Sequence, residues 1–277
     1  MSTVLLTSIP PIKDDLRLNE RLSYQKKCIA TWLATGHQPI SLNSEHEIPD
    51  LMSLFPEVDF HAAYRSTAPI NHRNLVYISD LIALALEQPC ERLAICNADV
   101  FFEPTIQFTA GLPSGLPLAY SHRIDIANFE IDIDGKTFFG IDYVNLSKNF
   151  AAELTDTIFA LGLPWWDYWL PLDAIRKGFK PVSLTWDNRP LLQHLLHGDR
   201  WDASSLVYLG QHALTLIGLG HDLTQTNQLE IQQRFFQFRE HFEGNGFQPS
   251  ASIYASLARD LCRYIQENSH THDFRPQ

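Results

Sequence analysis

The segment Leu93-Ala94-Ile95-Cys96-Asn97-Ala98-Asp99 joins four apolar residues directly to a polar triplet. Such an apolar run predicts a strand, over residues 92–96, that is buried on both faces of a sheet. Polar side chains then appear where the strand ends. Because ligands of open α/β sheets bind at the carboxyl ends of the strands, the segment predicts a site at Asn97 and Asp99.

The residues before this segment alternate between strand and helix patterns. Strands are expected over residues 3–9, 39–42 and 58–64, and an apolar stripe predicts a long helix over residues 74–87. This alternation is typical of βαβ units and a parallel sheet. We therefore expect an α/β fold with a mostly parallel mixed sheet flanked by helices.

The second half of the chain is less regular, and we expect it to complete one domain over residues 1–277. Strands are predicted over residues 117–121, 130–133, 138–144 and 182–185. The predicted core spans residues 3–202, and a helical extension follows over residues 203–268. Its helices include a stripe of Ile231, Phe235, Phe238 and Phe242. The polar tail, residues 269–277, is expected to be frayed.

Composition limits the partners that the chain can take. The 32 acidic residues outnumber 21 basic ones, and the formal charge of -11 disfavours binding to nucleic acid or to an anionic bilayer. No apolar run reaches the roughly 20 residues of a membrane helix. The first residues lack a basic start and look like a strand, so export is not expected. Four well separated cysteines fit reduced thiols, and we expect a cytoplasmic protein.

The triplet also has the chemistry of a cation site. Asn97 and Asp99 point the same way along an extended chain and offer one amide oxygen and one carboxylate. Hard divalent cations bind through such oxygens and keep further positions for water and phosphate. The alternative is a turn in which Asn and Asp are chosen for local hydrogen bonds.

At Asn97-Ala98-Asp99 the sequence resembles the glycosyltransferases of the GT-A fold, which end a core strand in an Asp-x-Asp motif. The resemblance implies a nucleotide-sugar donor, with Mn²⁺ or Mg²⁺ on Asp99. It also implies donor contacts from Asn97 and from the residues that line the nucleotide and sugar-phosphate pockets, Ser8, Ile9, Pro10, Arg123 and Asp125. Asp142 would lie beside the acceptor. Taken without the family, a structural ion pair of Arg123 with Asp125 or Asp142 explains these residues equally well.

An aromatic segment surrounds a single acid at Asp167. The flat faces of Trp165, Trp166 and Trp169 suit sugar rings, which predicts an acceptor site. Asp167 resembles the acid that the family places at the start of a helix near the acceptor, where it would bind the acceptor or act as the base. The alternative is a packed aromatic corner with Asp167 in the first turn of a helix.

Histidines and an arginine follow later in the chain. The family often returns a late histidine to the metal or the diphosphate, and His197 is the first choice here, with His194 as the alternate. Arg189 could hold phosphate through its forked guanidinium group. Without the family, these histidines fit surface or capping positions.

The sequence therefore predicts a transferase that moves a sugar from a nucleotide-sugar donor to a carbohydrate or other small acceptor. The alternatives are a nucleotide- or sugar-binding protein of the same fold without turnover, and a hydrolase that uses the carboxylates. Neither the sugar, the nucleotide nor the oligomeric state follows from the sequence.

Overall fold

The computed structural model describes residues 3–12, 18–67, 74–102, 112, 115–127, 135–154, 157–196, 203–218 and 251–274. The first hundred residues contain the expected alternation. In chain order the elements are β1 (Thr3–Thr7), α1 (Leu18–Ala34), β2 (His37–Asn43), a 3-10 turn η1 (Glu45–Glu47), α2 (Ile48–Leu54), β3 (Asp59–Ala62), α4 (Ile78–Glu87) and β4 (Arg92–Cys96). β1 pairs in parallel with both β2 and β4, and β2 with β3.

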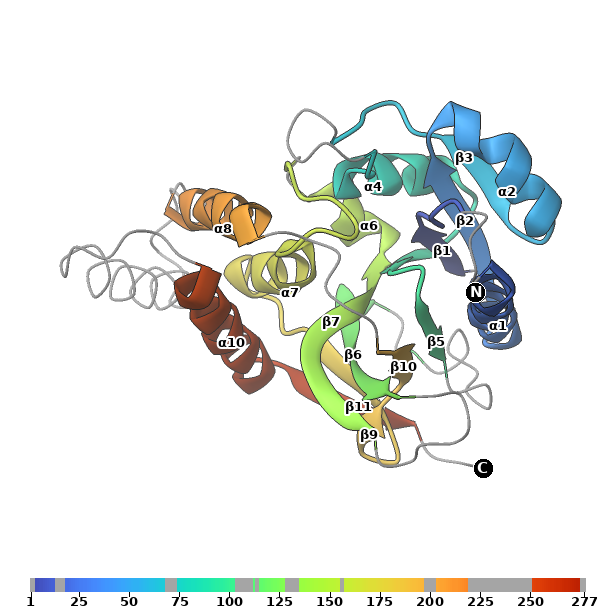
Figure 1. Cartoon of the computed structure of the whole chain (residues 1–277). Coiled ribbons are helices and arrows are strands. Elements are labelled where there is room, and N and C mark those ends of the chain that lie inside the picture. The colour runs from blue at the N-terminus through green and yellow to red at the C-terminus, as the bar shows by residue number, and fades with distance from the viewer. Residues whose placement is uncertain are drawn as a thin grey trace.

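The second half adds antiparallel strands and more helices. These elements are β5 (Val100–Phe102), β6 (Leu118–Ile126), β7 (Lys136–Ser147), α6 (Lys148–Ala152), α7 (Trp166–Arg176), β8 (Val182–Trp186), β9 (Arg189–Pro190), β10 (Leu192–Leu195), α8 (Ala203–Gly218), α10 (Ala251–Glu267) and β11 (His270–Phe274). Figure 1 shows how they follow one another.

One mixed sheet runs through the molecule in the order β11-β8-β6-β7-β4-β1-β2-β3. β10 joins it beside β6 and β5, and β9 beside β8. Six of its pairings are parallel and four are antiparallel among the described strands. The expected α/β fold with a mostly parallel mixed sheet flanked by helices is confirmed.

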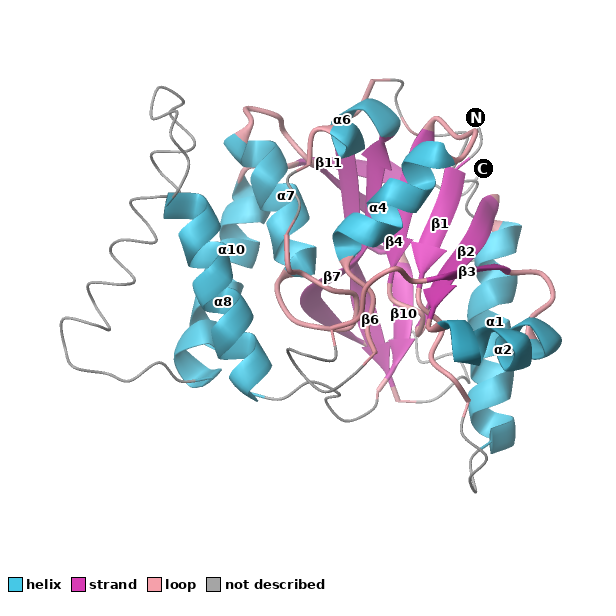
Figure 2. Ribbon diagram, turned by 90° about the horizontal axis from the view of Figure 1, so that it is seen from above, coloured by secondary structure: helices cyan, strands magenta, loops and turns pink. Residues whose placement is uncertain are grey.

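The strand before the polar triplet is buried on both faces. Leu93 and Ile95 pack in a core cluster with α4, α7 and α10, whereas Ala94 and Cys96 pack in a second cluster with α1. Figure 2 shows α4 across β4 and β1, with α1 and α2 near β2 and β3. A strand covered on both sides needs apolar residues at consecutive positions, which explains the run that opens the site.

The polar tail was predicted wrongly. Instead of fraying after residue 269, the chain forms β11, which pairs in parallel with β8 at the edge of the sheet. Asp273 Oδ1 accepts hydrogen bonds of 2.8 Å from Thr185 Oγ1 and from the backbone N–H of Asn188. The ring of His272 packs on Phe274 with 4.7 Å between centroids. An edge strand with one open side tolerates polar residues, so composition did not reveal it.

Parts of the second-half prediction fall outside the described residues, namely the strand over 130–133 and the aromatic stripe of residues 231–242. Within the part of the chain that the structure describes, α8 and α10 are the helices of the predicted extension, and Gly210 of α8 faces the ring of Tyr254 of α10. A bilayer-crossing helix would need more length and a more apolar sequence than any helix in this part has.

Asp273→Ala should lower the free energy of unfolding by about 1–2 kcal/mol, because it removes two hydrogen bonds to a carboxylate that join β11 to the β8–β9 turn. Urea denaturation would measure the change. Asp260→Ala, on the exposed side of α10, is the matched control and should leave stability unchanged. Equal stability of the two variants would contradict a structural role for β11.

Candidate functional site

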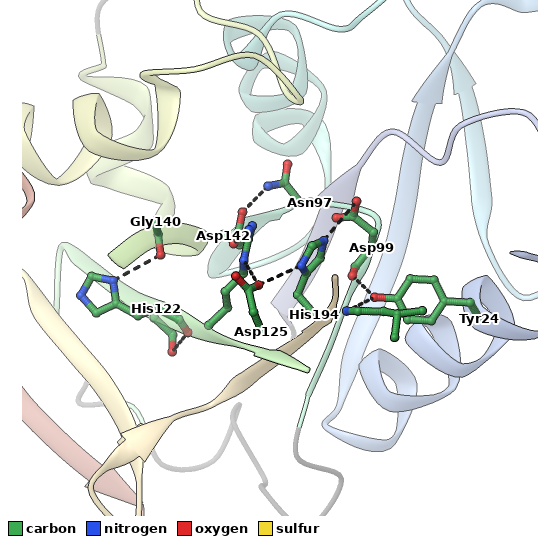
Figure 3. A network of polar contacts seen from close by, with 11 residues as sticks. Tyr24, Asn97, Asp99, His122, Asp125, Gly140, Asp142 and His194 are labelled. Atoms are coloured by element: carbon green, nitrogen blue, oxygen red, sulfur yellow. Dashed lines mark hydrogen bonds and ion pairs between the residues drawn. The ribbon is translucent and has the colours of Figure 1, made fainter. Parts of the chain in front are cut away.

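A network of polar side chains gathers where β4 ends and β6, β7 and β10 pass. Asn97 and Asp99 come from the turn between β4 and β5, Arg123 and Asp125 from β6, Asp142 from β7, and His194 from β10. Figure 3 shows Asn97, Asp99, Asp125, Asp142 and His194 close together. The structure thus brings together five site residues that the sequence predicted and the alternate histidine.

Arg123 is the centre of this network. Its Nε donates to Asp125 Oδ1 at 2.8 Å, and its Nη1 donates to Asp142 Oδ2 at 2.6 Å. The three side chains are largely buried. Burial opposes the charge on Arg123, but Asp142 and Asp125 outweigh it and raise the pKa of the guanidinium. Both ion pairs that the sequence left as alternatives are therefore present at once.

Asn97 is held by Asp142 through two hydrogen bonds. Its amide Nδ2 donates to Asp142 Oδ1, and its backbone N–H donates to the Asp142 carbonyl at 3.2 Å. In Figure 3 the amide oxygen of Asn97 lies on the side away from Asp142. An aspartate at this position would bring a second carboxylate against Asp142, which like-charge repulsion disfavours. The neighbour thus gives a physical reason for Asn in place of the first acid.

His194 lies between two carboxylates. Its Nδ1 is 3.0 Å from Asp125 Oδ1, and its Nε2 is 3.7 Å from Asp99 Oδ2. Burial opposes protonation, but the bonds with Asp125 and Asp99 prevail and raise the pKa of His194. Burial likewise opposes ionisation of Asp125, but the hydrogen bond with His194 and the charge of Arg123 hold its pKa below the usual value. The alternate histidine occupies the site, and His197 lies outside the described residues.

Tyr24 is a site residue that sequence reasoning missed. Its hydroxyl donates to the backbone carbonyl of Asp99 and accepts from the backbone N–H of Leu195 at 3.0 Å. It thereby ties the turn that carries Asp99 to the strand that carries His194 (Figure 3). No signal in the sequence distinguished this tyrosine from others on a helix.

The residues after β1 are placed at the same edge of the sheet. β1 and β4 are parallel and Leu6 pairs with Ile95, so Ser8 lies about level with Asn97. Ser8 is half-buried and Pro10 is exposed. Ile9 is fully buried, so its side chain cannot line a pocket as predicted. Its N–H donates to Ser41 Oγ and its carbonyl accepts from Asn43 Nδ2, so its backbone polar groups are occupied as well.

The tryptophans do not form the predicted acceptor surface. Trp165, Trp166 and Trp169 are only 1–3% exposed and belong to the core. Trp165 Nε1 donates to the carbonyl of Leu206 at 2.8 Å, and its ring meets the edge of Tyr254. Flat aromatic rings serve a core as well as a sugar site, and here the packed aromatic corner is what the structure contains.

Asp167 lies in the first turn of α7, as expected for a helix-starting acid. The residue keeps some exposure, but its Oδ1 is enclosed and has no hydrogen-bond partner. Loss of hydration and the nearby charge of Asp142 raise the pKa of Asp167 from 3.8 to about 7. A carboxyl group with this pKa can exchange a proton near neutral pH.

Arg189 is exposed on β9, in the hairpin that pairs with β8. The hydrogen bonds and ion pairs described above join the network through Arg123 and His194.

The network carries an excess of negative charge. Among the described residues, Asp99, Asp125 and Asp142 face the guanidinium of Arg123 and the imidazole of His194. Even with His194 protonated, the carboxylates outnumber the cations. Among the described residues, no three His, Cys, Asp or Glu side chains come together in a metal-binding arrangement. A cation at Asp99 would therefore need further ligands from water or from a bound anion.

Neither a protein-family model nor a curated protein sequence matches the chain. Among solved structures, it is similar to the inositol-1-phosphate CTP transferase from T. maritima, with 11% identity, a TM-score of 0.44, and coverage of 79% of this chain and 97% of that one. S. aureus TarS 1–349 gives 8% identity, a TM-score of 0.42 and coverage of 87% and 72%. The 4-diphosphocytidyl-2C-methyl-D-erythritolsynthase from Anaerococcus prevotii DSM 20548 gives 9% identity, a TM-score of 0.37, and coverage of 85% of this chain and 97% of that one. Likenesses of this size do not assign the chain to a family.

The difference in stability between Asp167→Asn and the wild type should change with pH, in favour of the variant as pH rises from about 4 to about 7. Because the pKa of this carboxyl is raised to about 7 in the folded state, the folded protein binds the proton more tightly than the unfolded chain. Wild-type stability should therefore fall as pH rises from about 4 to about 7, with no further loss from this group above that range. The asparagine variant lacks this loss. Thermal unfolding of both proteins between pH 4 and pH 8 would measure it, and a constant difference in Tm would contradict the raised pKa.

Proposed function

We propose that the protein is a glycosyltransferase that moves a sugar from a nucleotide-sugar donor to a hydroxyl group of a carbohydrate acceptor. The observation that carries the proposal is the network itself. At one end of the network, Asp99 follows β4 and faces His194. Toward the other end, Asp142 pairs with Arg123 and lies near Asp167, whose pKa is about 7. A site of this kind can bind a cation and an anion at one end and deprotonate a hydroxyl at the other.

The donor diphosphate would bind with a divalent cation, Mn²⁺ or Mg²⁺. The excess of carboxylates would repel a diphosphate without such a charge. Asp99 Oδ2 and His194 Nε2 face each other at 3.7 Å and suit a shared ion. The other nitrogen of His194 rests on Asp125, as is usual for a histidine that binds metal. When bound, the ion would offset the negative charge that develops on the leaving diphosphate.

Asp167 would take the proton from the acceptor hydroxyl. Its pKa of about 7 lets the carboxylate form at neutral pH while keeping it basic enough to accept a proton. Its Oδ1 is enclosed, so an acceptor hydroxyl would have to meet the part of Asp167 that stays exposed. Both oxygens of Asp142 already accept hydrogen bonds, Oδ1 from Asn97 and Oδ2 from Arg123, so this residue would help to orient the acceptor.

The proposal is tested by thermal shift with UDP-, GDP-, dTDP- and CMP-linked sugars, with and without Mn²⁺, followed by a nucleotide-release assay with mono- and disaccharide acceptors. We expect metal-dependent stabilisation by one donor class and nucleotide release that requires an acceptor. Metal-dependent binding without release or hydrolysis would favour a binding protein instead. Activity on simple glycosides or phosphate esters without any nucleotide would favour a hydrolase.

Asp99→Ala should remove the Mn²⁺-dependent stabilisation by the donor and leave the protein folded. Removing a partner of a metal ligand already weakens metal sites about 10- to 100-fold, so removing a ligand should weaken donor binding by at least about 100-fold. Titration calorimetry with donor and Mn²⁺ would measure the affinity. Asp59→Ala is the control, because this exposed residue of β3 pairs with His61, away from the network. Wild-type affinity in Asp99→Ala would rule out the metal assignment.

Asp167→Asn should lower kcat by about 100-fold or more, since the base is lost, while donor affinity stays within about twofold. In the wild type, kcat should rise with pH through about 7, because only the ionised carboxylate accepts the proton. Steady-state kinetics between pH 5.5 and pH 8.5 would check both statements. A variant that keeps the wild-type pH profile would show that another group is the base.

A further inference from the structure

Phe138 is a large apolar side chain that the fold leaves open to solvent. Near the start of β7, it is 44% exposed, whereas Tyr120 on β6 and Tyr143 on β7 are fully buried. The ring is nevertheless held in place. The guanidinium of Arg123 lies over it, 4.3 Å from the ring centroid. An exposed ring with one face on a buried cation is a rigid apolar surface.

Gly140 makes room for this arrangement. A Cβ atom at position 140 would overlap the Phe138 ring, so any larger residue there would push the ring away. The ring therefore packs on a glycine on one side and on Arg123 on another, and its position is set by both. A glycine inside a strand often marks such a close approach.

Gly140, on which the ring packs, lies at the end of the network opposite Asp99, the proposed donor position. In Figure 3, Gly140 and Asp99 lie at opposite ends, with Asp142 and Asp125 between them. Arg123, which contacts the ring, donates to Asp142 Oδ2 at 2.6 Å. A molecule that packs on Phe138 would thus have the Asp142 carboxylate within reach, and it would not occupy the position of the donor.

We propose that Phe138 is the platform for the acceptor, and that this acceptor is a neutral, polyhydroxylated ring with one apolar face. The inference rests on the proposed function for the identity of the reaction, but its own ground is the shape and charge of this end of the site. The ring offers a flat apolar face to the C–H groups of a pyranose. The carboxylates of Asp142 and Asp167 accept hydrogen bonds from hydroxyl groups and repel an anionic ligand. A hydroxylated sugar meets both conditions.

Saturation-transfer NMR with methyl glucopyranoside, methyl galactopyranoside and methyl mannopyranoside tests the proposal on the full chain. The wild type should transfer saturation to the C–H protons of one apolar sugar face. Phe138→Ala should weaken this binding by about tenfold, in keeping with the contribution of an aromatic contact. Phe138→Tyr keeps the ring and should bind like the wild type. Gly140→Ala should weaken binding as well, because its Cβ displaces the ring.

Phe179→Ala is the matched control, because Phe179 is also an exposed ring, 37% exposed, but packs on Phe150 beyond the far end of α7. It should leave glycoside binding unchanged. Absence of glycoside binding in the wild type, or equal binding by Phe138→Ala, would overturn the platform. The donor thermal shift is measured in parallel on every variant. If the wild type shows no thermal shift with any donor, the proposed transferase is contradicted. If Phe138→Ala keeps both the donor thermal shift and the glycoside binding of the wild type, only the role of Phe138 is contradicted.

Discussion

The arrangement of the site depends on one buried cation. Arg123 is held between Asp125 and Asp142, and a guanidinium removed from water is stable only when its partners are in place. Asp142 in turn holds Asn97 at the end of β4, and Asp125 holds His194 on β10. Strands β6, β7 and β10 and the end of β4 are thus joined by hydrogen bonds and ion pairs around Arg123. The sheet supplies the backbone frame, and Arg123 fixes how the polar side chains face one another within it.

This constraint also explains the departure from two acids at the end of β4. Asp142 already shares the guanidinium of Arg123 with Asp125, so among the described residues another carboxylate at position 97 would add negative charge beside a cation that is already paired. An amide in that place donates a hydrogen bond to Asp142 where a carboxylate would repel it. Asp99 is therefore the only acid of the triplet. The side chain that faces it is the imidazole of His194, not a second carboxylate of the triplet. The cation proposed for this corner would therefore depend on the imidazole as much as on the motif.

The sequence predicted the fold from features that packing requires, and it failed where one composition serves two purposes. The run from Leu93 to Cys96 has to be apolar because helices cover both faces of β4, so the strand was predictable, as was the polar triplet that follows it at the edge of the sheet. The tryptophans of α7 suit a sugar site and a core equally, and only burial distinguishes the two. The tail, residues 269–277, is polar, yet an edge strand tolerates polar residues, so β11 was missed. Tyr24 acts through its hydroxyl on backbone atoms 75 and 171 residues away, and no local pattern encodes that.

The buried Trp165 still affects the candidate site, because it determines where Asp167 lies. Trp165 has a φ of 85°, a left-handed conformation that is costly for a bulky residue and persists only where the surroundings hold it. Those surroundings are the hydrogen bond of its indole N–H to Leu206 and the packing of its ring on Tyr254 of α10. The strained turn starts α7 and thereby sets where Asp167 stands beside Asp142. Helices α8 and α10 thus hold the aromatic corner that fixes the position of the carboxyl group with the pKa of about 7.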